Sequence, residues 1–425
     1  SYEDYTFKRG FWLNNSIPEP SLLFSKRSYA KTPQFAVGSS VFPLPEPGQE
    51  TATPLKSWEE PSSHAVFKEG EDWRGKANIG SMGPSNTGSF LEFLDKNKIA
   101  RRLKDLKEEN FDAILINGML SRHTFPTHVE RSEQNIADIV EQGHKLNMKF
   151  IDHQDHTLLW DLESGFRVLV ENMPYLQQTI TGQLSARGYC PSNPIYKEIF
   201  IERIYNHVLK TNIDGIMIDE VSFHGLNFCG CAECRKLFTA ETGWYLPADE
   251  CSEELFNNDS KLWRAWLRWR QKRIGDFWYK LKKRIHSYRP DFVCMGYSTH
   301  YGMLSTYASL TQGGALEQSA RGWDFLGTEI MTRNIYANYR SIKSLRQAKS
   351  QFQYSAGLPI FGLVYTAAFD WDLMYFGWAL NNMLGQRTWE MTGRYCPDDK
   401  INYRLFTTEK GNIDITSAKQ LAKVA

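Results

Sequence analysis

Short apolar runs alternate with longer amphipathic stretches along most of the chain after residue 76. Residues 214–220 hold three successive apolar side chains between a glycine and two carboxylates, which is typical of a strand buried on both faces. Residues 131–147 instead place apolar side chains at helical spacing, with Ile136 and Ile139 on one face. The alternation predicts strands and helices in regular succession.

The strand pattern recurs seven times. Strands are predicted at residues 77–80, 111–117, 148–153, 214–220, 292–297, 323–329 and 359–365. Helices are predicted at residues 98–110, 131–147, 193–211, 263–286, 335–350 and 371–390. Buried strands that are separated by helices indicate a parallel sheet, because parallel neighbours need a crossover connection.

The number of strands favours an α/β fold of the (βα)8, TIM-like barrel type over a doubly wound sheet. No Gly-x-Gly-x-x-Gly or phosphate-binding loop pattern follows an early strand, which also disfavours the doubly wound alternative. We place a candidate eighth strand near residues 392–395.

The chain divides into three parts on this pattern. Proline, serine and glycine recur throughout residues 1–75. This composition predicts an irregular N-terminal extension on the main domain. Residues 76–400 form the predicted catalytic barrel. Residues 401–425 end in a pattern typical of a helix that enters a strand, which indicates a tail or the start of a further domain.

Composition excludes some classes of partner. The 50 basic and 49 acidic residues give a net charge of +1, so the usual electrostatic argument for nucleic acid or an anionic membrane does not apply. No apolar run is long enough to span a bilayer. The sequence shows no signal-peptide core, so we leave the compartment open between a soluble cytoplasmic protein and one exported after processing, and we leave homo-oligomerisation open as well.

Polar residues gather where the predicted strands end. In a parallel barrel the carboxyl ends of the strands carry the chemistry, whereas strand interiors are packing. An aromatic content of 14% suits both a packed core and stacking on sugars. The candidate substrate-binding residues are Asn117, His153, Asp155, His156, His300, Tyr301, Tyr365, Asp370 and Trp371.

Three carboxylates are the candidate catalytic set. Asp219 and Glu220 directly follow an apolar run, and a carboxylate in that position needs partners or a function. Glu329 follows another apolar stretch two strands later, with Asp370 in reserve. Glycosidic cleavage needs two carboxyl groups, one as proton donor and one as nucleophile or base. The pattern therefore predicts a glycoside hydrolase that acts on a terminal sugar or a short oligosaccharide.

Two other functions fit the same strand ends. A catalytically inactive barrel would bind carbohydrate without cleaving it. A metal-dependent hydrolase would use the cluster of Asp152, His153, Asp155 and His156 as ligands.

Cys229, Cys231 and Cys234 lie close enough in sequence to bind one tetrahedral zinc ion with a fourth ligand from elsewhere. Cys190 is the preferred fourth ligand, with His224 and Cys251 as alternatives. The other interpretation is a loop of free thiols or one disulfide. We predict structural zinc and no organic cofactor.

The segment 185–245 resembles the middle of the family 42 β-galactosidases and related glycoside hydrolases. It contains a Cys190-Pro191 segment before a helix, a strand that ends in Glu220, and the cysteine cluster. The resemblance implies that Glu220 is the acid/base, that Cys190 and the three clustered cysteines hold structural zinc, and that a flavodoxin-like domain follows the barrel.

The chain departs from that family at two positions. Asp219 stands where the family has asparagine before the glutamate, and residues 363–366 carry no carboxylate where the family has its nucleophile. The phrase Asp214-Gly215-x-x-x-Asp219 also resembles barrels of the α-galactosidase type. That resemblance implies Asp219 as nucleophile and Glu329 as acid/base, and the two assignments stay open.

Overall fold

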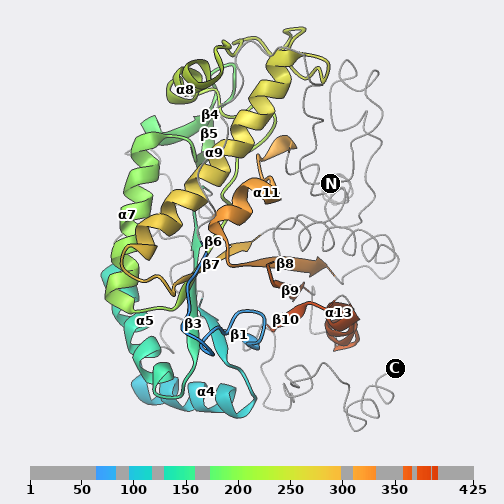
Figure 1. The fold of residues 1–425 in the computed structure, drawn as a ribbon. Helices are drawn as coiled ribbons and strands as arrows, with labels where there is room; N and C mark the ends of the chain where they lie inside the picture. The colour runs from blue at the N-terminus through green and yellow to red at the C-terminus, as the bar shows by residue number, and fades with distance from the viewer. Residues whose placement is uncertain are drawn as a thin grey trace.

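The computed structural model describes residues 64–82, 95–116, 129–157, 173–297, 310–331, 358–365, 371–383 and 385–390 (Figure 1). Eight parallel strands in this part close into a barrel, in which each strand pairs with two neighbours. In chain order they are β1 (Ile79–Met82), β2 (Ala113–Ile116), β3 (Lys149–Asp155), β6 (Gly215–Asp219), β7 (Val293–Tyr297), β8 (Phe325–Met331), β9 (Ile360–Tyr365) and β10 (Arg387–Glu390). The predicted TIM-like barrel is therefore confirmed.

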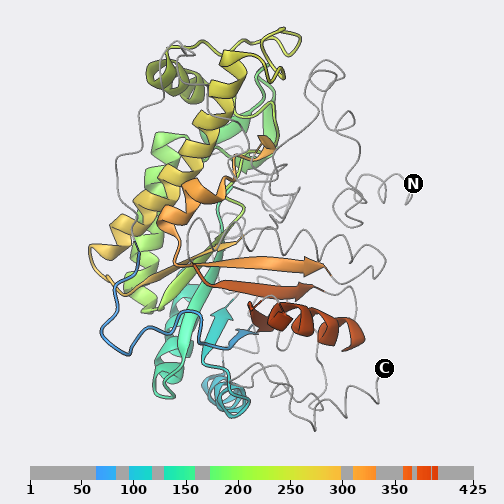
Figure 2. The ribbon, with the colours of Figure 1, turned by 45° about the vertical axis from the view of Figure 1, so that its right-hand side comes forward.

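Helices connect the barrel strands within the described residues. They are α4 (Lys96–Glu108), α5 (Val129–His144), α7 (Pro194–Thr211), α8 (Ala232–Thr242), α9 (Lys261–His286), the short α11 (Leu316–Ser319) and α13 (Trp371–Met383). Helices α7 and α9 run side by side along one wall of the barrel (Figure 1). In the turned view, β8 and β9 lie next to one another with α13 beside them (Figure 2).

Sequence determines where the two long helices of this wall begin. Asn193 precedes α7 and its side chain accepts hydrogen bonds from the backbone N–H groups of Ile195 and Tyr196, while Pro194 occupies the first helical position. Ser260 caps α9 in the same way through the N–H of Trp263. These caps satisfy N–H groups that have no partner inside the helix.

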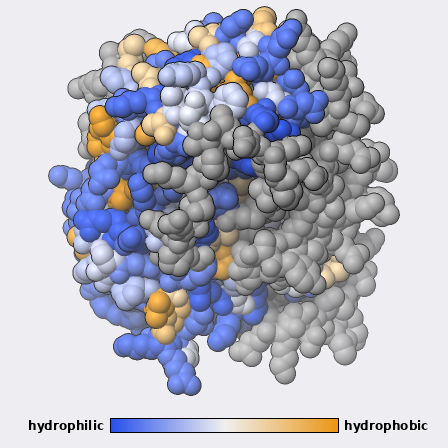
Figure 3. All heavy atoms as spheres, turned by 45° about the horizontal axis from the view of Figure 1, so that its top comes forward, coloured by the Kyte–Doolittle hydropathy of each residue, from blue (hydrophilic) through white to orange (hydrophobic). Residues whose placement is uncertain are grey.

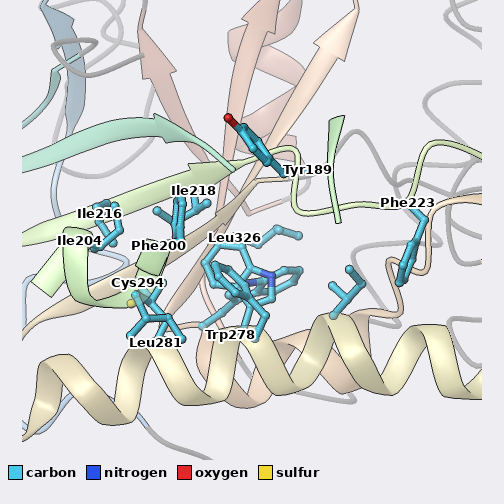
Figure 4. Packing of buried hydrophobic residues seen from close by; sticks show 14 of the residues in the cluster. Tyr189, Phe200, Ile204, Ile216, Ile218, Phe223, Trp278, Leu281, Cys294 and Leu326 are labelled. Carbon is cyan, nitrogen blue, oxygen red and sulfur yellow. The ribbon is translucent and has the colours of Figure 1, made fainter. Parts of the chain in front are cut away.

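Alternate residues of each strand face two different cores. One cluster fills the barrel interior and contains Ile151, Met217, Val293, Met295, Phe325, Phe361 and Leu363. The other lies between the strands and the helices. There, Ile216, Ile218, Cys294 and Leu326 of the strands pack with Phe200 and Ile204 of α7 and Trp278 and Leu281 of α9 (Figure 4). The alternation fixes which side chains reach the barrel axis.

Buried carboxylates hold the amino end of the barrel together. Asp324, before β8, accepts hydrogen bonds from the backbone N–H groups of Ala65 and Cys294 at 2.7 Å each and pairs with the buried Lys282 of α9. Asp214, before β6, accepts from Lys149 Nζ at 2.9 Å and interacts with His144 Nε2 at 2.8 Å. These two aspartates therefore tie strands to the helices and to the segment before β1.

A separate unit lies over the carboxyl ends of β3 and β6. It consists of a 3-10 turn (Met173–Tyr175), the antiparallel hairpin of β4 (Leu176–Gln178) and β5 (Leu184–Tyr189), and the loop from residue 220 into α8. The hairpin and α8 lie at the same end of the molecule in Figure 1. We call this unit, together with Cys190 directly after β5 and with α8, the cysteine module, because it contains all four predicted zinc ligands.

Some predicted boundaries are wrong. The eighth strand is β10 at Arg387–Glu390, earlier than the predicted 392–395, because the preceding helix ends at Met383 and Gly385 adopts a left-handed conformation. Strand β3 continues to Asp155, past the predicted end at residue 153, because its pairing with β6 extends that far. The predicted helix 335–350, residues 1–63 of the extension and the tail 401–425 lie outside the described residues.

The surface adds little to the functional picture. On the face in Figure 3, the described residues are mostly hydrophilic, with hydrophobic side chains scattered among them. Among the described residues, no helix combines the length and the apolar character that crossing a bilayer requires.

We expect Asp324→Asn to lower the free energy of unfolding by about 3–5 kcal/mol, because the buried ammonium group of Lys282 then loses its counter-charge. Urea unfolding would measure the change. The matched control is Asp291→Asn, which removes a partly exposed partner of Arg289 and should cost about 0–1 kcal/mol. Equal losses in the two variants would contradict the role assigned to Asp324.

Candidate active site

Three polar side chains converge at the carboxyl ends of β3 and β6. His153 and Asp155 are two residues apart on β3, in phase with the interior residue Ile151, and Asp219 is in phase with the interior residue Met217 on β6. One ligand atom from each of His153, Asp155 and Asp219 lies within 4.8 Å of the others. The strand ends thus carry a polar cluster at the position where TIM barrels place their chemistry.

The strand register brings the two carboxylates of this cluster together. Asp155 pairs directly with Asp219 across the β3–β6 ladder. His153 Nε2 lies 3.4 Å from Asp219 Oδ2 and 3.9 Å from Asp155 Oδ1. Asp219 Oδ1 accepts the backbone N–H of Glu220 at 2.7 Å, which orients the carboxylate. The side chain of Asp155 is buried, whereas that of Asp219 is 19% exposed.

His153 supplies positive charge between the two carboxylates. Burial opposes its protonation, but the hydrogen bond with Asp219 and the charges of Asp155, Asp219 and Asp152 outweigh burial and raise the pKa of His153 above its ordinary value. The imidazolium form therefore offsets the repulsion of carboxylates that face each other on adjacent strands.

Glu220 is placed differently from Asp219. It directly follows β6, at a position where the alternation of the strand no longer determines the direction of the side chain. Its backbone is left-handed, with φ of 54°, and its carbonyl accepts a hydrogen bond from the Thr157 hydroxyl. The chain bends at this residue, and the described cluster of His153, Asp155 and Asp219 does not include it.

Glu329 lies on β8, the sixth strand of the barrel in chain order. Its backbone pairs in register with Leu363, an interior residue of β9, and it is four residues after Phe325, another interior residue. The position therefore has the interior phase, at the same end of the barrel as Asp219. Its side chain lies outside what the structure describes.

The predicted metal set of Asp152, His153, Asp155 and His156 is wrong, because alternate residues of β3 face opposite sides. Asp152 Oδ2 is bound by Gln154 Nε2 at 2.7 Å and lies 2.9 Å from His207 Nε2 of α7, on the helix side of the strand. Only His153 and Asp155 of the set share the cluster with Asp219.

His156 lies between the barrel and its helices. Its ring is fully buried, with centroids 4.5 Å from that of Phe200 on α7 and 4.2 Å from that of Phe277 on α9. Burial, followed by the positive charges of Arg203 and Lys197, lowers the pKa of His156 well below its ordinary value. The predicted contact of His156 with substrate is therefore wrong, because aromatic rings cover it.

Most other predicted contacts cannot be placed. Asn117, His300, Tyr301 and Asp370 lie outside the described residues. For Tyr365 and Trp371 the structure describes only the backbone: Tyr365 ends β9 at the carboxyl end of the barrel, and Trp371 begins α13.

The structure brings four cysteines together in the cysteine module. They are Cys190, Cys229, Cys231 and Cys234, all buried, with sulfurs within 4.8 Å of one another. Cys190 Sγ lies 3.4 Å from Cys234 Sγ and 3.9 Å from Cys231 Sγ. Of the alternative fourth ligands, Cys251 is exposed and His224 Nδ1 lies 2.9 Å from the Ser185 hydroxyl, so neither belongs to the group.

The donors of this cluster suit a zinc ion. Zn–S bonds of about 2.3 Å in a tetrahedron separate the sulfurs by about 3.8 Å, close to the two separations above. Cys231 is the N-cap of α8 and Cys234 lies in its first turn, where the helix dipole favours negative charge. The backbone N–H of Gln178 donates to Cys229 Sγ at 3.3 Å. Hydrogen bonds from the neighbouring cysteines lower the pKa of Cys231, whereas burial raises the pKa of Cys190 and of Cys234, so a bound cation would be what holds the whole set deprotonated.

Sequence reasoning missed Gln177. This buried glutamine of β4 connects the hairpin to the loop that follows Asp219 and Glu220, through side-chain hydrogen bonds described below. A glutamine in a short irregular strand carries no motif, so no pattern could have singled it out.

Comparison with known proteins supports the fold. No protein-family model matches the sequence, and a search of curated proteins finds no match. The glycoside hydrolase domain of PgaB from Bordetella bronchiseptica aligns with a TM-score of 0.51 and 15% identity, over 76% of this chain and 94% of that domain.

Two β-galactosidases align over 82% of this chain. The enzyme from Rahnella sp. R3 has a TM-score of 0.51 and 11% identity, and the one from the haloarchaeon Halorubrum lacusprofundi has a TM-score of 0.50 and 12% identity. The chain spans only 55% and 57% of their respective lengths. At these identities the similarity shows a shared TIM-barrel fold.

We expect His153→Gln to lower the free energy of unfolding by about 1–2 kcal/mol at pH 6. Because the pKa of His153 is raised in the folded state, its stabilisation is complete below the unfolded value near 6.5 and disappears as the pH rises through the folded value. Urea unfolding of both proteins from pH 5.5 to 9 should show a difference that shrinks with pH. A difference independent of pH would contradict the imidazolium assignment.

Proposed function

We propose that the protein is a glycoside hydrolase whose catalytic carboxylates are Asp219 and Glu329. The observation that carries the proposal is the placement of Asp219 at the end of the fourth barrel strand, with its carboxylate oriented by the Glu220 N–H and facing His153 and Asp155. The interior phase of Glu329 on the sixth strand supplies the second carboxyl group that glycosidic cleavage requires.

The position of the strand end supports Asp219 over Glu220. Asp219 belongs to the cluster with His153 and Asp155, whereas Glu220 lies at the left-handed bend after the strand and outside that cluster. This favours the roles implied by the α-galactosidase-type resemblance, with Asp219 as nucleophile and Glu329 as acid/base. Asp219 is suited to attack because the Glu220 N–H binds its Oδ1 and orients the carboxylate, while its side chain stays partly exposed.

Asp155 and His153 fit substrate binding. A carboxylate beside the nucleophile can accept hydrogen bonds from two adjacent sugar hydroxyls, and such bonds strengthen as the ring distorts toward the transition state. His153 then serves two roles, because it neutralises the carboxylate pair in the free enzyme and can donate to a hydroxyl in the complex.

The fold comparisons agree with a carbohydrate substrate. The aligned structures are described as a glycoside hydrolase domain and as β-galactosidases. They do not support family 42 in particular. A terminal sugar or short oligosaccharide is therefore proposed as the substrate class, within a barrel at residues 76–400 that follows an N-terminal extension and precedes a tail or a further domain.

We expect Asp219→Asn and Glu329→Gln each to reduce kcat at least about a thousandfold without loss of folding. Glu220→Gln is the matched control, and it should change kcat by less than about tenfold. Turnover of a panel of aryl glycosides, followed by hydrolysis of the matching oligosaccharides, would measure all three. A large loss in Glu220→Gln alone would transfer the catalytic role to Glu220.

A barrel that only binds carbohydrate would give a different result in the same assay. Oligosaccharide would bind to the wild-type protein without being hydrolysed. The three variants would then have no rate of hydrolysis to change. Glycan binding by calorimetry without turnover would therefore replace the enzyme proposal by this second candidate.

A metal-dependent hydrolase remains the third candidate, because one specific arrangement favours it. His153, Asp155 and Asp219 offer one imidazole and two carboxylates within 4.8 Å, a ligand set suited to a divalent cation. A metal ion there would replace the proton on His153 as the positive charge between the carboxylates, and Asp219 would then be a ligand rather than a nucleophile.

We propose zinc as a structural cofactor of the cysteine module. The four cysteines would hold the ion. Its bonds to their thiolates would join the hairpin, the loop and α8. None of them belongs to the cluster at the barrel axis, so zinc takes no part in the proposed bond cleavage.

We expect one zinc ion per chain by atomic emission analysis of the purified protein. Cys231→Ser should lose that zinc and unfold at a lower temperature, whereas Cys251→Ser, a change at an exposed cysteine outside the cluster, should keep it. Two metal ions per chain, one of them lost in Asp155→Asn, would support the metal-dependent hydrolase instead. No metal in the wild-type protein would contradict the zinc proposal.

A further inference from the structure

The loop that follows the proposed nucleophile is hydrogen-bonded along its length to Thr157 and to the hairpin of β4 and β5. The Thr157 hydroxyl donates to the carbonyl of Glu220, and the N–H of Ile180 donates to the carbonyl of Asn227 at 2.8 Å. The N–H of Gly230 donates to the carbonyl of Gln178 at 2.7 Å. The strand that carries Asp219 therefore continues into a segment whose position the hairpin determines.

Gln177 makes the central connection between the hairpin and this loop. Its side chain is fully buried, and its Nε2 donates to the carbonyls of Tyr189 at 3.0 Å and Ser222 at 3.1 Å. Its Oε1 accepts the backbone N–H of His224 at 3.0 Å. One amide thus satisfies three backbone groups, two of them in the loop and one in β5, next to Cys190.

Close backbone packing leaves little freedom at the same contact. A Cβ atom on Gly188 of β5 would lie 2.0 Å from the ring of His224. A Cβ atom on Gly230 would lie 2.5 Å from the carbonyl oxygen of Thr179. The hairpin and the loop therefore fit together only with glycine at both positions, and a shift in one of them must move the other.

We propose that Gln177 is a positioning residue for the catalytic strand end: its amide fixes residues 220–224 to β5, which ends at Tyr189 next to Cys190, so that the hairpin of the cysteine module sets the position of Asp219. The inference rests on the proposed function for its effect on turnover, although its effect on the loop does not depend on that function.

The physical basis is the short distance along the chain. Ser222 and His224, which Gln177 holds, are three and five residues after Asp219, and the left-handed bend at Glu220 lies between them. The N–H of Glu220 is also the group that orients the Asp219 carboxylate. Displacement of an oriented nucleophile by about 1 Å costs about a hundredfold in rate, so loss of this support should act on the chemical step.

The test compares Gln177→Met with Gln183→Met. Gln177→Met keeps the length of the side chain and removes all three hydrogen bonds, whereas Gln183→Met makes the same change at an exposed position of the same hairpin. We expect Gln177→Met to retain its zinc and to reduce kcat about 10–100-fold, while KM changes less than about threefold. Gln183→Met should match the wild-type protein in all three quantities.

Hydrogen exchange measured by mass spectrometry gives a readout that needs no substrate. In Gln177→Met, amides of residues 218–228 should exchange faster, while those of residues 265–280 in α9 stay unchanged. Removal of zinc from the wild-type protein with a chelator should accelerate the same loop amides. Gln177→Glu should resemble Gln177→Met, because an ionised carboxylate cannot donate to the carbonyls of Tyr189 and Ser222.

The outcomes separate the two proposals. Unchanged exchange of residues 218–228, or faster exchange across α9 as well, would overturn the positioning role, as would an unchanged kcat in a variant whose loop has loosened. Absence of turnover in the wild-type protein would defeat the proposed function alone, and the exchange of the loop amides would still decide whether Gln177 holds it.

Discussion

The register between β3 and β6 places two aspartates opposite each other, and the candidate site depends on that pairing. Asp155 and Asp219 face each other at the carboxyl ends of adjacent parallel strands, where their like charges repel. His153, two residues before Asp155 on the same face, supplies the positive charge that offsets the repulsion. Because the three side chains come from two paired strands, the ladder hydrogen bonds that build the barrel also fix the geometry of the cluster.

Aspartates have different roles at the two ends of this barrel. At the amino end, Asp214 and Asp324 are surrounded by donors: backbone N–H groups, Lys149 and Lys282. These carboxylates are fully engaged and have little capacity left for a substrate. At the carboxyl end, Asp219 has one backbone donor and a nearby imidazole, and it is partly exposed. The difference in partners, more than the residue type, separates a structural aspartate from a candidate nucleophile.

The sequence was most informative where a single period or spacing decides the outcome. The alternation of buried strands and helices predicted the barrel, and the spacing of Cys229, Cys231 and Cys234 located a cluster that the fold completes with Cys190. It failed where the phase of one strand decides. Asp152 and His156 were predicted as site residues, yet both lie on the helix side, because alternate residues of β3 face opposite sides and only His153 and Asp155 share the face of Asp219. Contacts that only the tertiary structure creates, such as those of Gln177, have no sequence pattern from which they could be predicted.

The cysteine module offers a way to position the end of β6, a barrel strand of only five residues. β6 stops at Asp219, and beyond it the barrel ladder gives no further support. The chain then bends at Glu220. Hydrogen bonds to Thr157, Gln177 and Gln312 hold the loop that follows. A loop of this kind is normally a mobile part of a fold. Zinc bound at Cys229 and Cys231, as proposed, would anchor the far end of this loop and shorten the free segment, and a shorter segment loses less conformational entropy when the strand end is fixed. Under the proposed function, zinc held by four cysteines remote from the chemistry would thus order the strand end that carries Asp219.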